Sequence, residues 1–275
     1  MSMFRKLNEF YLFLVEEEKS ISTIEKYVRD VKLFVEYVDG RTITKQEVMS
    51  YKKSLSEKYS PTSMNSMLVS LNRFLHFIDR SDCCVKLLKI QRKIFASEGR
   101  ELTVSEYRRL LSASRGTRLE LVIRTICETG IRVSELKFIT ADAVRQGCAV
   151  VDCKSKTRVI FIPKQLQKDL LRYIKKTGIT AGSVFVTRNG KPLNRSNIWR
   201  DMKALCHRAG VDPCKVFPHN LRHLFARTFY SIERDIVKLA DILGHSSINT
   251  TRIYTVETGK QHVVCLDRVQ RRLMT

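Results

Sequence analysis

Apolar residues recur at helical spacing in the first part of the chain. Within residues 24–38 they follow one another at steps of three and four, which predicts a helix with one buried face. Ser22 or Thr23 is placed to cap the start of this helix. Residues 43–57 and 62–78 show similar patterns, and the short connections between these segments predict a compact helical bundle.

The helical pattern weakens over residues 91–101, a basic stretch. We expect it to link the bundle, residues 1–90, to a second domain over residues 102–275. A length of 275 residues agrees with two domains. The second domain opens with Thr103 and Glu106, which have the spacing of a capping box, so a new helix is expected to begin there.

The period of the pattern changes after residue 147. The segment CAVVDCKSKTRVIFIP contains two runs rich in β-branched residues on either side of CKSKT, which predicts a small antiparallel hairpin. Helical patterns surround it, at residues 117–129, 164–176, 194–209, 218–230, 233–243 and about 257–272. The expected fold class is mainly α, with a helical bundle followed by a mixed α/β domain that contains a small antiparallel sheet.

The composition is strongly basic. The chain carries a net charge of +22, of which residues 1–95 contribute +5 and residues 96–275 contribute +17. Because both parts are basic, the simplest expected partner is one long polyanion that contacts both, and nucleic acid fits this description.

Other classes of protein are disfavoured by the same reading. No apolar run approaches the ~20 residues that a membrane span needs. The apolar patch near the N-terminus is followed at once by Glu16, Glu17 and Glu18, unlike a secretory signal, so a cytoplasmic, nucleoid-associated protein is expected. The cysteines show no C-x-x-C or other zinc spacing, and neither a metal nor another cofactor is expected.

Three short stretches carry candidate chemistry: TGIRVSEL at 129–136, HNLRH at 219–223 and LGHSSINTTRIYT at 243–255. Each alone has an ordinary interpretation. Arg132 could form a structural ion pair with Glu135, and a tyrosine such as Tyr254 is often a core aromatic.

Taken together and in this order, the stretches resemble the tyrosine recombinase family, also called the phage integrase family, and most closely its short Xer-like members. The family pattern falls on Arg132, Lys154, His219, Arg222, His245 and Tyr254. The resemblance covers the whole chain. It implies a SAM-like core-binding domain that clamps DNA, followed by a catalytic domain.

These residue types suit the transfer of a DNA phosphodiester to a protein hydroxyl. Phenols ionise near pH 10, well below aliphatic alcohols, so a tyrosine needs less help to become a nucleophile. Two arginines can bind the non-bridging oxygens of a pentavalent phosphate and replace a metal in that role. The resemblance implies that Tyr254 is the nucleophile and that Arg132 and Arg222 stabilise the transition state.

The resemblance also implies roles for the remaining positions. Lys154 would protonate the leaving 5′ oxygen, although Lys156 is the alternative if the hairpin register is shifted. His219 would act in proton transfer with the tyrosine, and His245 would hydrogen-bond the phosphate. Glu135 would orient its neighbours. His223 lies off the pattern and is expected to be structural.

Contacts with DNA are expected in both domains. The segment 194–209 is equivalent to one that approaches the major groove in the family, and its candidates are Arg195, Arg200 and Lys203. In the first domain the candidates are Lys26 and Arg73. The last segment carries Val263, Leu266, Val269 and Leu273 near helical spacing, and relatives exchange this helix between subunits.

The function implied is that of a site-specific DNA recombinase that works through a 3′-phosphotyrosyl intermediate, in integration and excision of a mobile element, inversion or resolution. The implied partner is double-stranded DNA at an inverted-repeat core site, bound by a homotetramer. The need for an accessory protein or a second recombinase stays open. Two alternatives remain: a type IB topoisomerase-like activity, and a DNA-binding regulator or accessory protein without catalysis.

Overall fold

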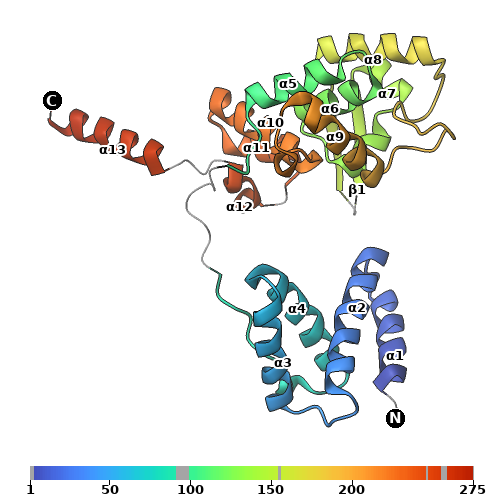
Figure 1. Ribbon diagram of the computed structural model, residues 1–275, viewed down its shortest axis with the longest axis vertical. Coiled ribbons are helices and arrows are strands. Elements are labelled where there is room, and N and C mark those ends of the chain that lie inside the picture. Colours follow the sequence, from blue (N-terminus) through green and yellow to red (C-terminus); the bar gives the residue numbers. More distant parts are fainter. Residues whose placement is uncertain (1–2, 91–98, 154–155, 246, 255–258, 275) are drawn as a thin grey trace. The chain divides into compact units, whose positions relative to one another are not determined.

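The computed structural model, shown in Figure 1, describes residues 3–90, 99–153, 156–245, 247–254 and 259–274. The chain divides into two compact units, Met1–Arg92 and Lys93–Thr275. The described part is mainly helical and includes one two-stranded antiparallel sheet. Among the described helices, none combines the length and the apolar character that a membrane crossing requires.

The first unit is built from helices that bury the apolar faces expected from the sequence. Its elements are α1 (Met3–Glu16), α2 (Ile21–Val38), α3 (Lys45–Lys58), α4 (Pro61–Phe77) and a 3₁₀ turn η1 (Ser81–Cys83). Phe10, Phe34 and Phe74 are fully buried between them. Helix α2 packs against both α1 and α4.

The predicted cap of α2 was wrong. The helix begins at Ile21, and the residue in the N-cap position is Ser20, whose backbone is extended at φ −61° and ψ 145°. The Ser20 carbonyl accepts the first backbone hydrogen bonds, from Thr23 at 2.8 Å and Ile24 at 3.0 Å. Ser22 and Thr23 therefore lie inside the first turn, where their backbones are already helical.

The second unit starts with the capping box that the sequence predicts. The Thr103 side chain accepts a hydrogen bond from the Glu106 backbone N–H, and the Glu106 carboxylate accepts one from the Thr103 backbone N–H. Helix α5 (Val104–Ser114) follows, and then α6 (Arg118–Thr129). Helix α6 ends at Gly130, which is in the left-handed conformation at φ 65°.

The predicted hairpin is confirmed. A 3₁₀ helix η2 (Val133–Phe138) and α7 (Ala141–Gln146) lead into β1 (Cys148–Cys153), which pairs antiparallel with β2 (Lys156–Phe161). In the register, Cys148 lies opposite Phe161 and Cys153 opposite Lys156.

Helices resume after the hairpin and complete the unit. They are α8 (Lys164–Thr177), α9 (Arg195–Ala209), η3 (Pro213–Lys215), α10 (Pro218–Glu233), α11 (Ile236–Leu243), α12 (Ile248–Thr251), η4 (Arg252–Tyr254) and α13 (Gly259–Met274). The predicted cap Asn194 accepts a hydrogen bond from the Asn197 backbone N–H at 2.8 Å. Helix α10 packs on α6 and α11, as Figure 1 shows.

The core of the second unit is mainly apolar. Leu110, Ile123, Leu166 and Leu221 are among its fully buried side chains. Beside this core lies Arg222, which is only 2% exposed. Because burial of a charged group is costly unless other groups satisfy it, the surroundings of Arg222 identify the site.

Candidate active site

The end of α11 gathers three arginines. Its last carbonyls have no partners within the helix and carry the negative end of the helix dipole. Ile242 O accepts from Arg158 Nη1 at 2.6 Å, and Leu243 O accepts from Arg222 Nη2 at 2.7 Å. Gly244 O lies 3.4 Å from Arg132 Nη2. Three consecutive carbonyls thus bind three guanidinium groups from different elements. They come from the residue before η2 (Arg132), from β2 (Arg158) and from α10 (Arg222).

A glycine turn provides a further hydrogen-bond acceptor for Arg222. Gly130 ends α6 with a positive φ, and its carbonyl accepts a hydrogen bond from Arg222 Nη1. A Cβ at Gly130 would collide with the Phe225 ring and approach Leu243 to 3.1 Å, so a larger residue does not fit here. The same glycine leads directly into Ile131 and Arg132, which explains why the GIR sequence brings two arginines of the site together.

Glu135 connects the other two arginines. Its Oε1 accepts from Arg132 Nη1 at 2.9 Å, and its Oε2 accepts from Arg158 Nη2 at 2.5 Å and from the Arg132 backbone N–H at 2.9 Å. Burial acts to raise the pKa of Glu135, but the Arg132 backbone N–H and the two guanidinium groups outweigh it and hold the pKa below its usual value. The carboxylate therefore stays charged and fixes both arginines.

Arg158 was missed by the sequence reasoning. It lies on β2, two residues after Lys156, and ties the hairpin to both Glu135 and α11. A signal was present, because a lone arginine within the apolar run of a strand needs a buried partner. The partner is Glu135, and the pattern gave no way to pair residues 23 positions apart.

The arginine cluster carries an excess of positive charge. Within the described residues, Glu135 is the carboxylate bound to this cluster, and it contacts Arg132 and Arg158 but not Arg222. Burial lowers the pKa of Arg222 to about 10, and the nearby Arg132 acts in the same direction. Arg222 is still protonated at neutral pH. Three cations around one anion form a site that favours a further anion.

Tyr254 lies against this cluster. Its side chain is buried and lies near Arg222. The His223 ring meets the Tyr254 ring edge-on at 4.6 Å, and the His245 ring is nearly parallel to it at 6.0 Å between centroids. The structure therefore brings together Arg132, His219, Arg222, His245 and Tyr254 of the predicted set.

The histidines of the site are held in the neutral form. Burial lowers the pKa of His245 to about 4, and Arg222, Arg132 and Arg158 act in the same direction. Burial also lowers the pKa of His219, which faces Arg222, Arg132 and Arg195.

His223 belongs to the same group. Burial lowers its pKa to about 4, and the neighbouring His219 adds to this effect. Its ring lies 4.5 Å from the His219 ring and also contacts Tyr254, so it stands between two predicted catalytic side chains.

A cavity of about 350 Å³ opens beside the arginines. It is lined by residues of η2 and its start, by the first turns of α9, and by the start of α10. Among them are Arg132, Ser134, Arg195, Trp199, His219 and Arg222. Four of these side chains carry basic groups, so the cavity can receive an anion next to Arg222.

The hairpin lysine is not settled by the described residues. Lys154 lies outside them, in the two-residue connection between Cys153 and Lys156. The backbone of Lys156 forms the first position of β2. Lys154 stays the prediction, with Lys156 as the alternative.

The predicted DNA contacts of α9 differ in their surroundings. Arg195 lines the cavity and lies near enough to His219 to affect its pKa. The Arg200 side chain is 72% exposed, 3.6 Å from Asp201. The Lys203 ammonium donates to the Pro213 carbonyl and lies 5.3 Å from the Trp199 ring centroid.

The two candidates in the first unit take part in internal contacts. Lys26 Nζ donates to Asp30 Oδ2 at 2.7 Å, to Ser66 O at 2.7 Å and to Ser70 Oγ at 2.9 Å. Because an ammonium has three donors, a DNA phosphate would have to replace one of these partners. Arg73 forms an ion pair with Glu17.

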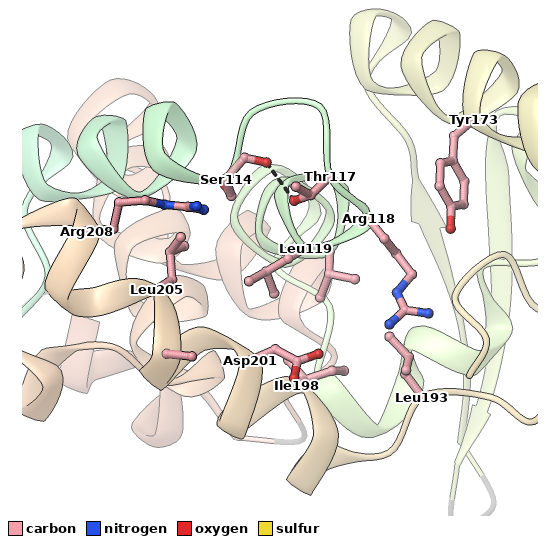
Figure 2. Close-up of a pocket in the computed structure, with 12 residues that line it drawn as sticks. Ser114, Thr117, Arg118, Leu119, Tyr173, Leu193, Ile198, Asp201, Leu205 and Arg208 are labelled. Atoms are coloured by element: carbon pink, nitrogen blue, oxygen red, sulfur yellow. Dashed lines mark hydrogen bonds between the residues drawn. The ribbon is translucent and has the colours of Figure 1, made fainter. Parts of the chain in front are cut away.

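A second and larger cavity, of about 520 Å³, lies elsewhere in the second unit (Figure 2). Arg118 and Arg208 line it, and their guanidinium groups donate to the carbonyls of Val186 and Ala113. Of the described catalytic positions, none lines this cavity. The smaller cavity is the better candidate for phosphate chemistry, because Arg132, His219 and Arg222 line it.

Comparison with known proteins agrees with this geometry. Residues 100–261 match the phage integrase family, and residues 7–81 match its N-terminal SAM-like domain. The tyrosine recombinase XerD of Xanthomonas campestris is 32% identical, over 91% of this chain and 86% of its own.

Two further relatives extend the likeness. The tyrosine recombinase XerA of Pyrococcus furiosus is 28% identical, over 95% of this chain and 93% of its own. A crystal structure of a XerA recombinase aligns with a TM-score of 0.54 at 26% identity, covering 98% of both chains. The chain therefore belongs to the phage integrase family, and it is a tyrosine recombinase.

Proposed function

We propose that Tyr254 is the nucleophile of a site-specific DNA recombination reaction. Its oxygen attacks the scissile phosphate, a 3′-phosphotyrosyl bond forms, and the 5′ oxygen leaves as a hydroxyl. The observation that carries this proposal is the packing of the buried Tyr254 against His245, whose ring hydrogen-bonds Arg222 at the edge of a basic cavity. The new bond keeps the energy of the old phosphodiester, so the reverse attack by a 5′ hydroxyl rejoins the DNA.

The arginines bind the phosphate in this proposal. Arg132 and Arg222 both line the cavity and can donate to the two non-bridging oxygens. Glu135 holds Arg132 in place through its carboxylate. Arg158 does not line the cavity and supports the site from behind, through Glu135 and Ile242.

Proton transfer is assigned to the remaining groups. A neutral imidazole can accept a proton, and the lowered pKa of His219 keeps it neutral at pH 7. His219 lines the cavity, where it can take part in the transfer from the attacking phenol. Lys154, in the connection of the hairpin, is proposed to protonate the leaving 5′ oxygen.

The nucleophile acts within its own subunit in this proposal. Tyr254, His245 and Arg222 of one chain already contact one another. Cleavage in cis needs no tyrosine from a neighbouring subunit, although strand exchange still needs paired subunits on DNA.

DNA is proposed to contact Arg195, Arg200 and Lys203 of α9, and Lys26 and Arg73 of the first unit. A homotetramer on an inverted-repeat core site, in the nucleoid, completes the proposal. Supporting it, a solved structure of the XerH site-specific recombinase is a complex with difH DNA, and it shares this fold with a TM-score of 0.67 at 20% identity. Helix α13 exposes Val269 and Leu273, which would suit exchange between subunits.

Covalent capture tests the proposal. Wild-type protein and the Tyr254→Phe variant are incubated with DNA fragments from the source genome, stopped with denaturant, and the attached DNA is sequenced. Tyr230→Phe is the matched control, because Tyr230 is a partly buried tyrosine of α10 in the same apolar cluster. We expect adducts at one discrete site with the wild type and the control, and none with Tyr254→Phe.

Two other outcomes would count against the proposal. Adducts scattered without sequence preference would indicate a topoisomerase-like activity. If intact sites give no adduct, the assay is repeated with nicked duplexes. After cleavage of these substrates the short strand that carries the 5′ hydroxyl dissociates, so rejoining is prevented and the covalent product accumulates. The absence of adducts on these substrates, despite DNA binding, would contradict catalysis and leave a DNA-binding regulator.

A further inference from the structure

The His245 ring is held by hydrogen bonds on both of its nitrogens. Nε2 lies 3.1 Å from Arg222 Nη2, and Nδ1 lies 2.8 Å from Thr251 Oγ1. Thr251 ends the short helix α12 and is fully buried, three residues before Tyr254. The ring therefore bridges the phosphate-binding arginine and the segment that carries the nucleophile.

These two contacts fix the tautomer of the ring. A guanidinium group offers only N–H donors, so Nε2 must be the acceptor of the Arg222 hydrogen bond. A neutral imidazole then carries its proton on Nδ1 and donates it to the Thr251 hydroxyl oxygen. The lowered pKa of His245 agrees with a neutral ring.

This arrangement cannot donate to a phosphate. Nε2, the nitrogen nearer the arginine cluster, has no proton. The Thr251 hydroxyl acts as an acceptor, and within the described residues the structure shows no acceptor for its own proton. A buried donor without an acceptor is unfavourable, so among the described residues this hydroxyl is left unsatisfied in the anion-free site.

A phosphate next to Arg222 would favour the opposite tautomer of the His245 ring. Its oxygens can accept both from Arg222 and from an Nε2–H group. The deprotonated Nδ1 would then accept from the Thr251 hydroxyl, which turns from acceptor to donor. In this second arrangement each of the three groups has a suitable partner.

We propose that Thr251 is a positioning residue that lets His245 change tautomer when a phosphate enters the site. One proton leaves Nδ1 for solvent water and one is taken up at Nε2, so the ring stays neutral and the number of protons is unchanged. The inference rests on the phosphate site proposed above, and it assigns to the Thr251 hydroxyl a role in both states.

Nitrogen NMR of the histidine rings tests this directly. Wild-type protein with ¹⁵N-labelled histidine is measured free and saturated with inorganic sulfate, which has four acceptor oxygens and no proton at neutral pH. His245→Gln assigns the signal. We expect an Nδ1–H ring in the free protein and an Nε2–H ring with sulfate.

The outcomes separate the two proposals. If sulfate shifts none of the signals of His245 or its neighbours, the anion site and hence the proposed function are contradicted. If sulfate shifts them but the ring keeps its proton on Nδ1, the role of Thr251 is overturned while the anion site remains.

Variants connect the tautomer to catalysis. Thr251→Val keeps the shape of the side chain but removes the hydroxyl, and we expect no tautomer change and about tenfold slower covalent cleavage of the captured DNA site. Thr251→Ser should restore both. Thr250→Val, at the exposed threonine of the same helix, is the matched control and should cleave at the wild-type rate.

A merely structural role is distinguished by a double variant. In a His245→Ala background, Thr251→Val should cost no further cleavage rate, because the partner of its hydroxyl is already gone. An equal further loss in that background, or an equal loss in Thr250→Val, would overturn the proposal.

Discussion

At the scale of single residues, Glu135 is the side chain that connects the arginines of the site. It is almost fully buried, and its two oxygens hold Arg132 and Arg158. The loss of one partner in a buried ion pair leaves the other charges without compensation, which costs more than the pair itself contributes. The stability of the second unit should therefore depend on this carboxylate.

We expect Glu135→Gln to lower the free energy of unfolding by about 3–5 kcal/mol, because the largely buried Arg158 loses its anion and the partly exposed Arg132 loses a partner. Asp142→Asn is the control, since Asp142 pairs with Arg145 at the surface and its side chain is 67% exposed. That change should cost less than ~1 kcal/mol. Denaturant unfolding measures the stability of both variants. Equal losses would contradict the expected dependence of stability on Glu135.

The buried histidines predict a dependence of stability on pH. Histidine in an unfolded chain takes up a proton near pH 6.5, whereas burial lowers the pKa of His223 and His245 to about 4. Between these values the unfolded state binds more protons, so stability falls as the pH falls through this window and is constant above it.

The measurement is the unfolding midpoint in denaturant from pH 8 to pH 4.5. A His223→Gln, His245→Gln double variant should show a flatter profile than the wild type. His207→Gln is the control, because His207 lies exposed on α9. A wild-type profile without a decline below pH 6.5 would contradict the neutral assignment of these rings.

The residue types of the site could be predicted, but their partners could not. The order and spacing of Arg132, His219, Arg222, His245 and Tyr254 pointed to phosphoryl transfer. The contact of Arg158 with Glu135 and the position of His223 between His219 and Tyr254 depend on how separate elements pack. Nothing local in the sequence encodes that packing.

At the scale of elements, the end of α11 determines the arrangement of the arginines. Gly244 follows the helix with φ 63°, and a Cβ there would collide with the Arg158 side chain. Gly244 therefore serves two purposes: it allows the left-handed turn, and it leaves room for an arginine of the site.

We expect Gly244→Ala to displace Arg158 and to slow covalent cleavage. The control is Gly178→Ala, because Gly178 ends α8 with φ 69° and has open space where its Cβ would lie. Each variant should lose about 1–2 kcal/mol of stability through the left-handed backbone. Only Gly244→Ala should lose activity in the capture assay, and an equal loss in both would refute the steric argument.

Element boundaries were predictable where the signal is local. Thr103 with Glu106 and Asn194 with Asn197 cap their helices as expected, because a cap involves residues three positions apart. The start of α2 was misjudged because three hydroxyl residues in a short segment can each serve as a cap. The backbone conformation of Ser20 then decides among them.

At the scale of the whole molecule, charge and a single aromatic suggest how DNA approaches. Trp199 is the only tryptophan of the chain, is 49% exposed and lines the basic cavity. Arg195 and Lys203 lie one turn before and after it on α9, so this face alternates basic and aromatic groups.

We expect the fluorescence of Trp199 to change when the Tyr254→Phe protein binds a 30-base-pair duplex. Binding itself is followed independently by the anisotropy of labelled DNA. Arg200→Ala should lower the slope of log affinity against log salt by about one, because it removes one proposed phosphate contact. Saturable binding with unchanged tryptophan emission would place the DNA on another face.

The two-part organisation was readable from the loss of helical period near residue 91 and from the basic charge of both parts. The division lies at Arg92 and Lys93. Assembly on DNA was not readable, because apolar positions on α13 look the same whether they pack within one chain or between chains.

The three consecutive carbonyls that end α11 have a consequence for how chains of this kind can vary. One residue inserted or deleted within that helix would rotate its last turn by ~100° and aim each carbonyl away from its arginine. The same change before Tyr254 would shift the proposed nucleophile along its helix. Length is therefore fixed from Ile242 to Tyr254. The segment 179–193, between α8 and α9, makes none of these contacts. Insertions are expected to be tolerated at its exposed positions 188–192, away from the buried Val184 and Phe185.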